Sequence, residues 1–143
     1  MKFISQSNSH DCGFTCLKVL LSHVHHDSNY LYLPEKKETT YSFFDLKKLA
    51  EEHMLQLNGY RYEGSVVNLI DHKFPFIASI KTNETSHAVL VLKITKKNIK
   101  YFDPDIGKCV LKIKSFDEMW LGTTLEIISY KHLKCKDKPI SLV

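Results

Sequence analysis

The residues of this chain best suited to nucleophilic chemistry are a cysteine near the N-terminus and a histidine in the second half. Cys12 lies where an irregular polar segment gives way to an apolar run with helical spacing. Unpaired N–H groups and the dipole at a helix N-terminus favour the thiolate, which is the nucleophilic form of cysteine. His87 begins a later apolar run, and Asp103 directly precedes a proline. Cysteine, histidine and then an acid along the chain indicate a cysteine hydrolase that uses a histidine base.

Each of these residues has a defined role in such a hydrolase. His87 takes the thiol proton and later protonates the leaving amine. An acid on the imidazole orients the ring and stabilises its charged form, a role open to both Asp103 and the nearby Asp105. Gln6, six residues before Cys12, is suitably spaced to supply a side-chain N–H to an oxyanion hole. The backbone N–H of Cys12 is the second expected donor.

A wider set of motifs accompanies these residues. It consists of Gln6, Asp11-Cys12-Gly13, Cys16-Leu17, the run from Ser86 to Leu90, and Asp103-Pro104. With these motifs the chain resembles the peptidase C39 family, the N-terminal protease domains of bacteriocin-processing ABC transporters, over nearly its whole length. The resemblance implies a papain-like cysteine protease fold that needs no cofactor. It also selects Asp103, the acid immediately before proline, over Asp105.

The same resemblance implies a substrate class and partners. The substrate would be a bacteriocin or signalling precursor peptide, cut after the Gly-Gly pair that ends its N-terminal leader, and cleavage would be coupled to export. The partners would be the transmembrane and ATP-binding domains of the same transporter, which implies a place at the cytoplasmic side of a bacterial membrane. Two alternatives stay open: a domain of this type that holds its substrate without cleaving it, and a papain-like amidase of other specificity.

Length and composition predict one soluble domain over residues 1–143. The chain has a net charge of +4 and 43% hydrophobic residues, which is ordinary for a globular domain of this size. No apolar stretch is long enough to cross a membrane, and the first residues turn polar too soon for a signal peptide. The positive charges are dispersed along the chain, so no nucleic-acid partner is indicated. The four cysteines are expected to be free thiols.

Hydrophobic periodicity predicts helices in the first half of the chain and strands in the second. Helices are expected over 12–25 and 43–54, the second opening with a capping box at Ser42 and ending before Asn58-Gly59. One or two helical turns are expected over 66–70, and a short helix after the capping pair Ser115 and Glu118. The expected strands cover 60–62, 76–80, 87–94, 99–103, 110–113 and 123–128. This order predicts an α+β fold with N-terminal helices packed on a C-terminal antiparallel sheet.

An aromatic cluster lies at the start of the second predicted helix. The start of this helix carries more aromatic residues than it needs, namely Tyr41, Phe43 and Phe44. Packing in the core is the default interpretation, and the alternative is an exposed apolar groove that binds the leader peptide. Cys16, one helical turn after Cys12, is expected to pack in the core.

A metal site is not predicted. His23, His25 and His26 follow the C-x₃-C pair in the first helix and invite that interpretation. Structural zinc sites, however, combine such a pair with a second close pair, which this chain lacks because the other two cysteines are far apart. The histidines instead suit the C-terminal end of a helix.

Overall fold

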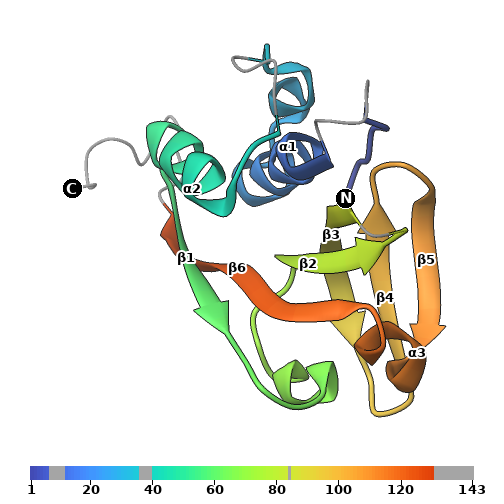
Figure 1. Ribbon diagram of the computed structural model, residues 1–143. Coiled ribbons are helices and arrows are strands. Elements are labelled where there is room, and N and C mark those ends of the chain that lie inside the picture. Colours follow the sequence, from blue (N-terminus) through green and yellow to red (C-terminus); the bar gives the residue numbers. More distant parts are fainter. Residues whose placement is uncertain (7–11, 36–39, 84, 131–143) are drawn as a thin grey trace.

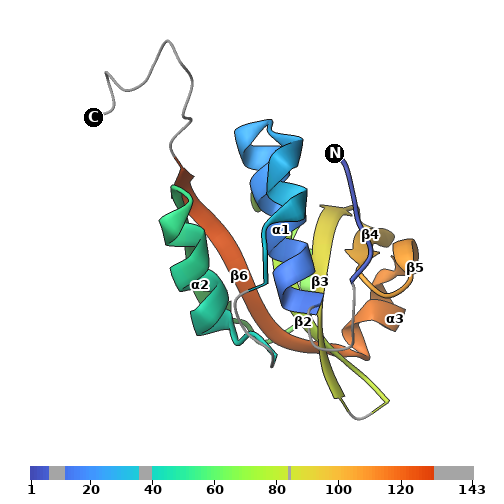
Figure 2. The ribbon, with the colours of Figure 1, turned by 90° about the horizontal axis from the view of Figure 1, so that it is seen from above.

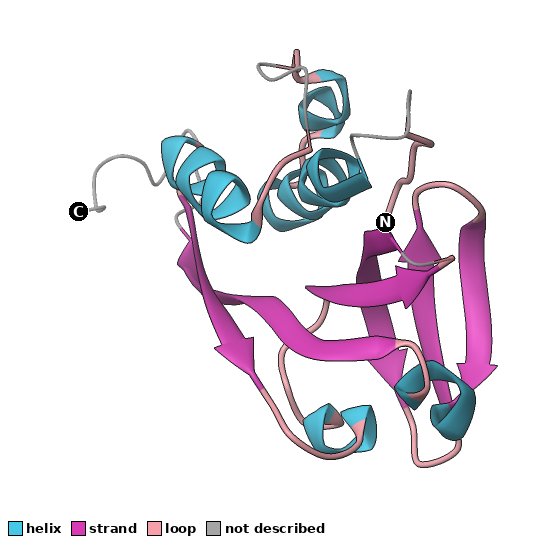
Figure 3. Cartoon of the chain, in the orientation of Figure 1, coloured by secondary structure: helices cyan, strands magenta, loops and turns pink. Residues whose placement is uncertain are grey.

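The computed structural model, which describes residues 1–6, 12–35, 40–83 and 85–130, contains one antiparallel sheet with helices on both faces (Figures 1 and 3). The helices are α1 (Cys12–His25), α2 (Phe43–Glu52), α3 (Ile113–Asp117) and the 3₁₀ helices η1 (Ser28–Tyr32) and η2 (Val66–Leu69). The strands are β1 (Leu55–Arg61), β2 (Phe76–Thr82), β3 (Thr85–Ile94), β4 (Asn98–Asp103), β5 (Gly107–Lys112) and β6 (Trp120–Tyr130). Their spatial order is β1-β6-β2-β3-β4-β5. The predicted α+β fold is confirmed.

Helix α1 coincides with the predicted helix over 12–25 and is buried along most of its length. It packs mainly on β3 and β2 and contacts α2, which lies beside it on the same face of the sheet (Figure 2). A Cβ atom added at Gly13 would lie 3.0 Å from Cδ1 of Leu46 in α2. A glycine at this position therefore permits the close approach of the two helices beside Cys12.

The capping box predicted at the start of α2 is confirmed. The Oγ of Ser42 accepts a hydrogen bond from the N–H of Asp45 (3.0 Å), and the Asp45 carboxylate accepts one from the N–H of Ser42 (2.9 Å). The helix ends at Glu52, before the predicted end at residue 54. Met54, at φ 63°, turns the chain directly into β1.

The first strand is longer than predicted, and the turn expected at Asn58-Gly59 is wrong. These two residues lie inside β1, where they pair with Glu126 and Leu125 of β6. Leu55 and Leu57 of the same strand are buried in the cluster beneath the helices. Burial of these two leucines and pairing with β6 override the local turn signal.

The predicted cap of the last helix is also wrong. Helix α3 begins at Ile113, its N-cap is Lys112 without a side-chain hydrogen bond, and Ser115 lies inside the helix. The N–H of Ile113 donates to the carbonyl of Lys97, and the fully buried Phe116 anchors the helix to the sheet. The helix start is therefore set by the end of β5 and by burial of Phe116.

The remaining elements agree with the prediction, with shifted ends. The turns over 66–70 and the five later strands are present, although β5 begins at Gly107 and β6 extends over Trp120–Tyr130. The segment that follows α1 contains η1, while residues 36–39 lie outside the described residues. The sheet separates two buried clusters, one under α1 and α2 and the other under η2 and α3.

Candidate active site

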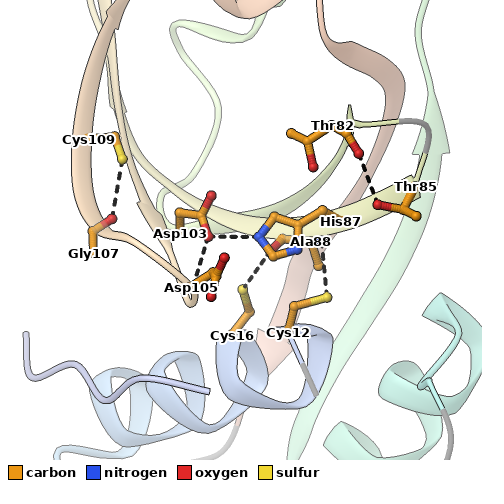
Figure 4. A network of polar contacts seen from close by, with 10 residues as sticks. All are labelled: Cys12, Cys16, Thr82, Thr85, His87, Ala88, Asp103, Asp105, Gly107 and Cys109. Atoms are coloured by element: carbon orange, nitrogen blue, oxygen red, sulfur yellow. Dashed lines mark hydrogen bonds and ion pairs between the residues drawn. The ribbon is translucent and has the colours of Figure 1, made fainter. Parts of the chain in front are cut away.

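The thiol of Cys12 lies against the strand that carries His87. Cys12 is the first residue of α1, and its side chain is only 7% exposed. Its Sγ accepts a hydrogen bond from the backbone N–H of Ala88, at 3.4 Å (Figure 4). Because Ala88 directly follows His87 in β3, this bond brings the start of the helix to the histidine. The neighbouring His87 also lowers the pKa of the Cys12 thiol.

His87 is held from its other side by Asp103. Its Nε2 lies 2.7 Å from Oδ1 of Asp103, which ends β4, the strand next to β3 (Figure 4). The Asp103 carboxylate also accepts the N–H of Asp105 at 2.9 Å. Asp105 is exposed and contributes this backbone group to the arrangement. Of Asp103 and Asp105, Asp103 is the acid that contacts the histidine. Because this contact uses Nε2, the other ring nitrogen, Nδ1, is available to Cys12.

The contacts favour a thiolate–imidazolium pair. Burial raises the pKa of the Cys12 thiol, but the hydrogen bonds to His87 and to the N–H groups of Ala88 and Gly13 outweigh it, so the pKa lies below the usual cysteine value. The hydrogen bonds to Asp103 and to Cys12 raise the pKa of His87 to about 10, against the effect of burial. A lowered thiol pKa beside a raised imidazole pKa stabilises the charged form of both groups near neutral pH.

The Asp103 carboxylate is charged in the same arrangement. Burial raises the pKa of Asp103, but the hydrogen bonds from His87 and from the N–H of Asp105 lower it by a larger amount. The net pKa lies below the usual range. The side chain is almost fully buried. A buried carboxylate on a histidine fixes the tautomer and orientation of the ring.

Cys16 occupies the core, as expected. It is fully buried, and its Sγ donates to the carbonyl of Ala88 at 3.7 Å (Figure 4). Burial, together with the nearby charges of Cys12 and Asp103, raises the pKa of the Cys16 thiol well above its usual value. The two thiols of α1 therefore differ in chemistry: the pKa of Cys12 is lowered, whereas Cys16 is a neutral packing group.

The N-terminal segment brings Gln6 to the same end of the sheet. The N–H of Gln6 donates to the carbonyl of Pro104, the residue after Asp103, at 3.0 Å. Phe3 packs against Phe102 with ring centroids 4.7 Å apart. These contacts anchor the backbone of Gln6 beside the acid of the site. Asp11, which directly precedes Cys12 in the motif, lies outside the described residues.

A cavity of about 280 Å³ opens beside the thiol, between the start of α2 and strands β2 and β3. Its lining comprises Cys12, Gly13, Thr40, Tyr41, Ser42, Phe43, Leu46, Ser79, Ser86, His87 and Ala88. Two of the three aromatic residues considered as a leader groove, Tyr41 and Phe43, therefore border the site. Phe44 is not among the lining residues, and it is 66% exposed.

Two serines that line this cavity, Ser79 and Ser86, were not among the candidate site residues. Ser86 precedes His87 and was named only as part of the histidine motif. Ser79 carries no signal of its own, because it reaches the site through its pairing with Ala88 across β2 and β3. Tyr41 was assigned to the core by default, and it does stack on Phe14 at 4.9 Å while also bordering the cavity.

The histidines at the end of α1 make other contacts. The Nε2 of His25 lies 2.6 Å from the carbonyl of His53, the C-cap residue of α2, and the ring also packs near Tyr30. Within the ranges that the structure describes, no three His, Cys, Asp or Glu side chains are grouped as metal ligands. Likewise, no helix in those ranges is long and apolar enough to cross a membrane.

Comparison with known proteins matches the model of the peptidase C39 family to residues 1–131. The transport/processing ATP-binding protein ComA of Streptococcus pneumoniae is 28% identical over 129 residues, covering 84% of this chain and 18% of ComA. The lactococcin-G-processing and transport ATP-binding protein LagD of Lactococcus lactis subsp. lactis is 28% identical over 128 residues. The chain thus spans 18% of the length of these transporters. An uncharacterised protein of Methanothermobacter thermautotrophicus is 23% identical and is covered over 86% of its length.

Solved structures share the fold. A double glycine motif protease from an AMS/PCAT transporter, in complex with its leader peptide, aligns with a TM-score of 0.74 and 22% identity, over 88% of this chain and 89% of that one. The peptidase domain of Streptococcus ComA aligns with a TM-score of 0.71 and 20% identity, over 88% and 96% of the two chains. The arrangement of helices on the antiparallel sheet is therefore that of these peptidase domains.

Proposed function

Because the chain belongs to the peptidase C39 family, we propose that it is a cysteine peptidase with Cys12 as nucleophile and His87 and Asp103 as the proton relay. The observation that carries this assignment is the 2.7 Å contact between Nε2 of His87 and the buried Asp103, together with the hydrogen bond that holds the Cys12 thiol at Ala88, the residue next to His87. Residues from the start of a helix and from two adjacent strands converge there, over 91 positions of sequence. Such a set matches the geometric pattern of an activated thiol nucleophile.

In the proposed first step, the Cys12 thiolate attacks the carbonyl carbon of the scissile peptide bond. The carbonyl oxygen becomes an oxyanion as the carbon turns tetrahedral. Collapse of this intermediate breaks the C–N bond, and Nδ1–H of His87 delivers its proton to the leaving amine. The product is a thioester on Cys12, and the Asp103 carboxylate keeps the ring oriented throughout.

In the second step, water hydrolyses the thioester. The neutral imidazole of His87 accepts a proton from the water as its oxygen attacks the thioester carbon. The C–S bond then breaks and returns the thiolate, paired again with the imidazolium. The acid product leaves, and no cofactor is needed in either step.

The oxyanion is proposed to bind between Gln6 and the N-terminus of α1. The N–H of Cys12 belongs to the first turn of the helix, where N–H groups have no partner within the helix. Gln6 supplies the second donor, and the hydrogen bond from its backbone N–H to the carbonyl of Pro104 anchors its backbone near the relay. Oxyanion donors of this kind contribute about 10²–10³-fold to turnover in a well-studied hydrolase.

The proposed substrate is a precursor peptide whose leader ends in Gly-Gly, with cleavage after the second glycine. One similar structure is a double glycine motif protease that holds its leader peptide. The wall of the cavity formed by β2 and β3 has small side chains, Ser79, Ser86 and Ala88, and the opposite wall has Tyr41 and Phe43. A slim segment without side chains fits between such walls, while the aromatic pair offers apolar contact to the leader.

The transporter relatives support a proposed context. ComA and LagD are named as transport and processing proteins, and this chain matches only a small part of each. We place the domain next to the transmembrane and ATP-binding domains of an exporter, on the cytoplasmic side of the membrane. Two alternatives remain. A domain that only holds its substrate does not need an activated thiol. An amidase would not need a leader on its substrate.

Cleavage of a synthetic precursor with a Gly-Gly leader tests the proposal directly. The protein should release the leader with its C-terminus at the second glycine, as read by mass spectrometry. Cys12→Ala should abolish cleavage, whereas the matched control Cys109→Ala, which removes a half-buried thiol that hydrogen-bonds to Gly107 and not to the relay, should cleave normally. A wild-type protein that binds the precursor without cleaving it would leave only the substrate-holding function. Hydrolysis of simple amides in preference to the leader peptide would favour the amidase.

A further inference from the structure

A lysine-rich surface lies on the part of the sheet beyond α1. Residues 93–114 contain seven lysines and two aspartates, although the whole chain has a net charge of only +4. Helix α1 packs mainly on β3 and β2, and Figure 2 shows β4 and β5 beside it. From these observations we propose that the lysine face, defined by Lys93, Lys100, Lys108 and Lys112, docks on an anionic phospholipid bilayer.

The strand register puts these four side chains on one face. Phe102 of β4 is buried in the cluster under α1, so its face of the sheet is the α1 side. Lys100 lies two residues away on β4, Lys93 is opposite Lys100 on β3, and Lys108 is opposite Phe102 on β5. Lys112 lies four residues after Lys108, which keeps it on the same side. All four lysines are exposed.

This arrangement has an electrostatic cost within the domain. Lys93 and Lys100 are directly opposite each other on paired strands, and like charges in that position are destabilising. The single acid within β3, β4 and β5 is Asp103, which is buried and bonded to His87. Asp105, in the turn between β4 and β5, is exposed beyond the end of the face. An anionic partner would offset the repulsion that the domain leaves uncompensated.

The shape and chemistry of the lysine face favour a bilayer over a peptide. The lysines are spread across three strands, each about 4.8 Å from the next, so a broad anionic surface meets all of them while one extended chain meets a single row. Lysine clusters attract anionic lipid headgroups without needing a fixed geometry. Val110, 61% exposed between Lys108 and Lys112, and Ile106, 74% exposed in the adjoining turn, supply apolar groups for the interface.

Vesicle co-sedimentation tests this proposal without any substrate. The protein is mixed with vesicles of phosphatidylcholine alone or of phosphatidylcholine with phosphatidylglycerol. Binding is expected only to the anionic vesicles and should decline as salt is raised. The variant Lys93→Ala/Lys100→Ala/Lys112→Ala should lower the partition constant about a hundredfold. The matched variant Lys48→Ala/Lys73→Ala/Lys114→Ala, which removes the same charge from other surfaces, should lower it only a few-fold.

Both variants should keep the precursor cleavage rate in solution, and neither should lower the melting temperature, which separates this proposal from the peptidase assignment. Absence of binding to anionic vesicles, or equal losses in the two triple variants, would overturn it. So would a third result, in which vesicle binding is unchanged but the face variant raises KM for a precursor with acidic residues. That result would assign the lysine face to the peptide.

Discussion

The backbone N–H of Ala88 donates to the thiol of Cys12 although the two residues are 76 positions apart in the chain. The carbonyl of the same alanine accepts a hydrogen bond from Cys16, so one residue of β3 is held by both cysteines of α1. Because His87 precedes Ala88, this double contact sets the position of the base relative to the nucleophile. The helix and the strand must therefore pack correctly before the site exists.

The two cysteines of α1 should respond differently to substitution. Cys12→Ala should abolish cleavage while leader binding persists, because binding is expected to rest on contacts away from the thiol. Cys16→Ser should retain most activity but lower stability by about 1–3 kcal/mol, since a hydroxyl would replace a fully buried thiol. Cleavage assays, leader titration and thermal melts on both variants measure these effects. The opposite pattern would show that the nucleophile is assigned to the wrong cysteine.

Asp103→Asn should lower kcat by orders of magnitude, whereas Asp105→Asn should change it little. Asp103 bonds to His87, while Asp105 contributes only its backbone N–H, which asparagine keeps. Loss of the acid that orients a catalytic histidine costs about 10⁴-fold in a well-studied triad. The two variants are isosteric with the wild type and serve as controls for each other in a steady-state assay. Equal effects would contradict the selection of Asp103.

The rate of cleavage should follow a bell-shaped pH profile whose two limbs are set by Cys12 and His87. The acid limb reports protonation of Cys12 and should lie below the ordinary cysteine range, because the pKa of that thiol is lowered. The alkaline limb should fall near pH 10, where His87 loses the proton that the leaving amine needs. Measuring kcat/KM against pH checks both limbs.

Alkylation by iodoacetamide gives an independent measure of the same thiolate. In the wild type the alkylation rate should rise at a pH below the ordinary cysteine range. His87→Ala should move that rise upward, because it removes the hydrogen bond and charge that lower the pKa of Cys12. An unchanged profile in this variant would mean that the imidazole does not stabilise the thiolate.

Alanine substitutions of the three aromatic residues at the start of α2 should differ in their effects on KM and on the melting temperature. Phe43→Ala should raise KM more than it lowers kcat, because the side chain borders the cavity and its loss removes binding. Tyr41→Ala should also lower the melting temperature, by an amount equivalent to about 3–5 kcal/mol, because the ring is buried on Phe14. Phe44→Ala, at an exposed position, is the control and should change neither value. A large KM effect at Phe44 alone would move the leader site to the outer side of α2.

Local patterns in the sequence determined the helices, most of the strands and the candidate chemistry. The apolar spacing of α1 and the capping box at Ser42 are signals within a few residues, so they predicted α1 fully and the start of α2. The order of Cys12, His87 and Asp103 predicted the type of hydrolase, because these residue types have few other common uses together. The motifs around them predicted the family.

Tertiary structure alone decided features that depend on distant partners. Pairing with β6 carried β1 through Asn58-Gly59, and burial of Phe116 set the start of α3 against the local capping signal. Ser79 reached the cavity through a neighbouring strand, and strand pairing brings lysines from β3, β4 and β5 to one face. Strand register joins residues by position across the sheet, and a single sequence does not reveal which positions will be opposite. That is why the chemistry was readable from the chain while the surfaces around it were not.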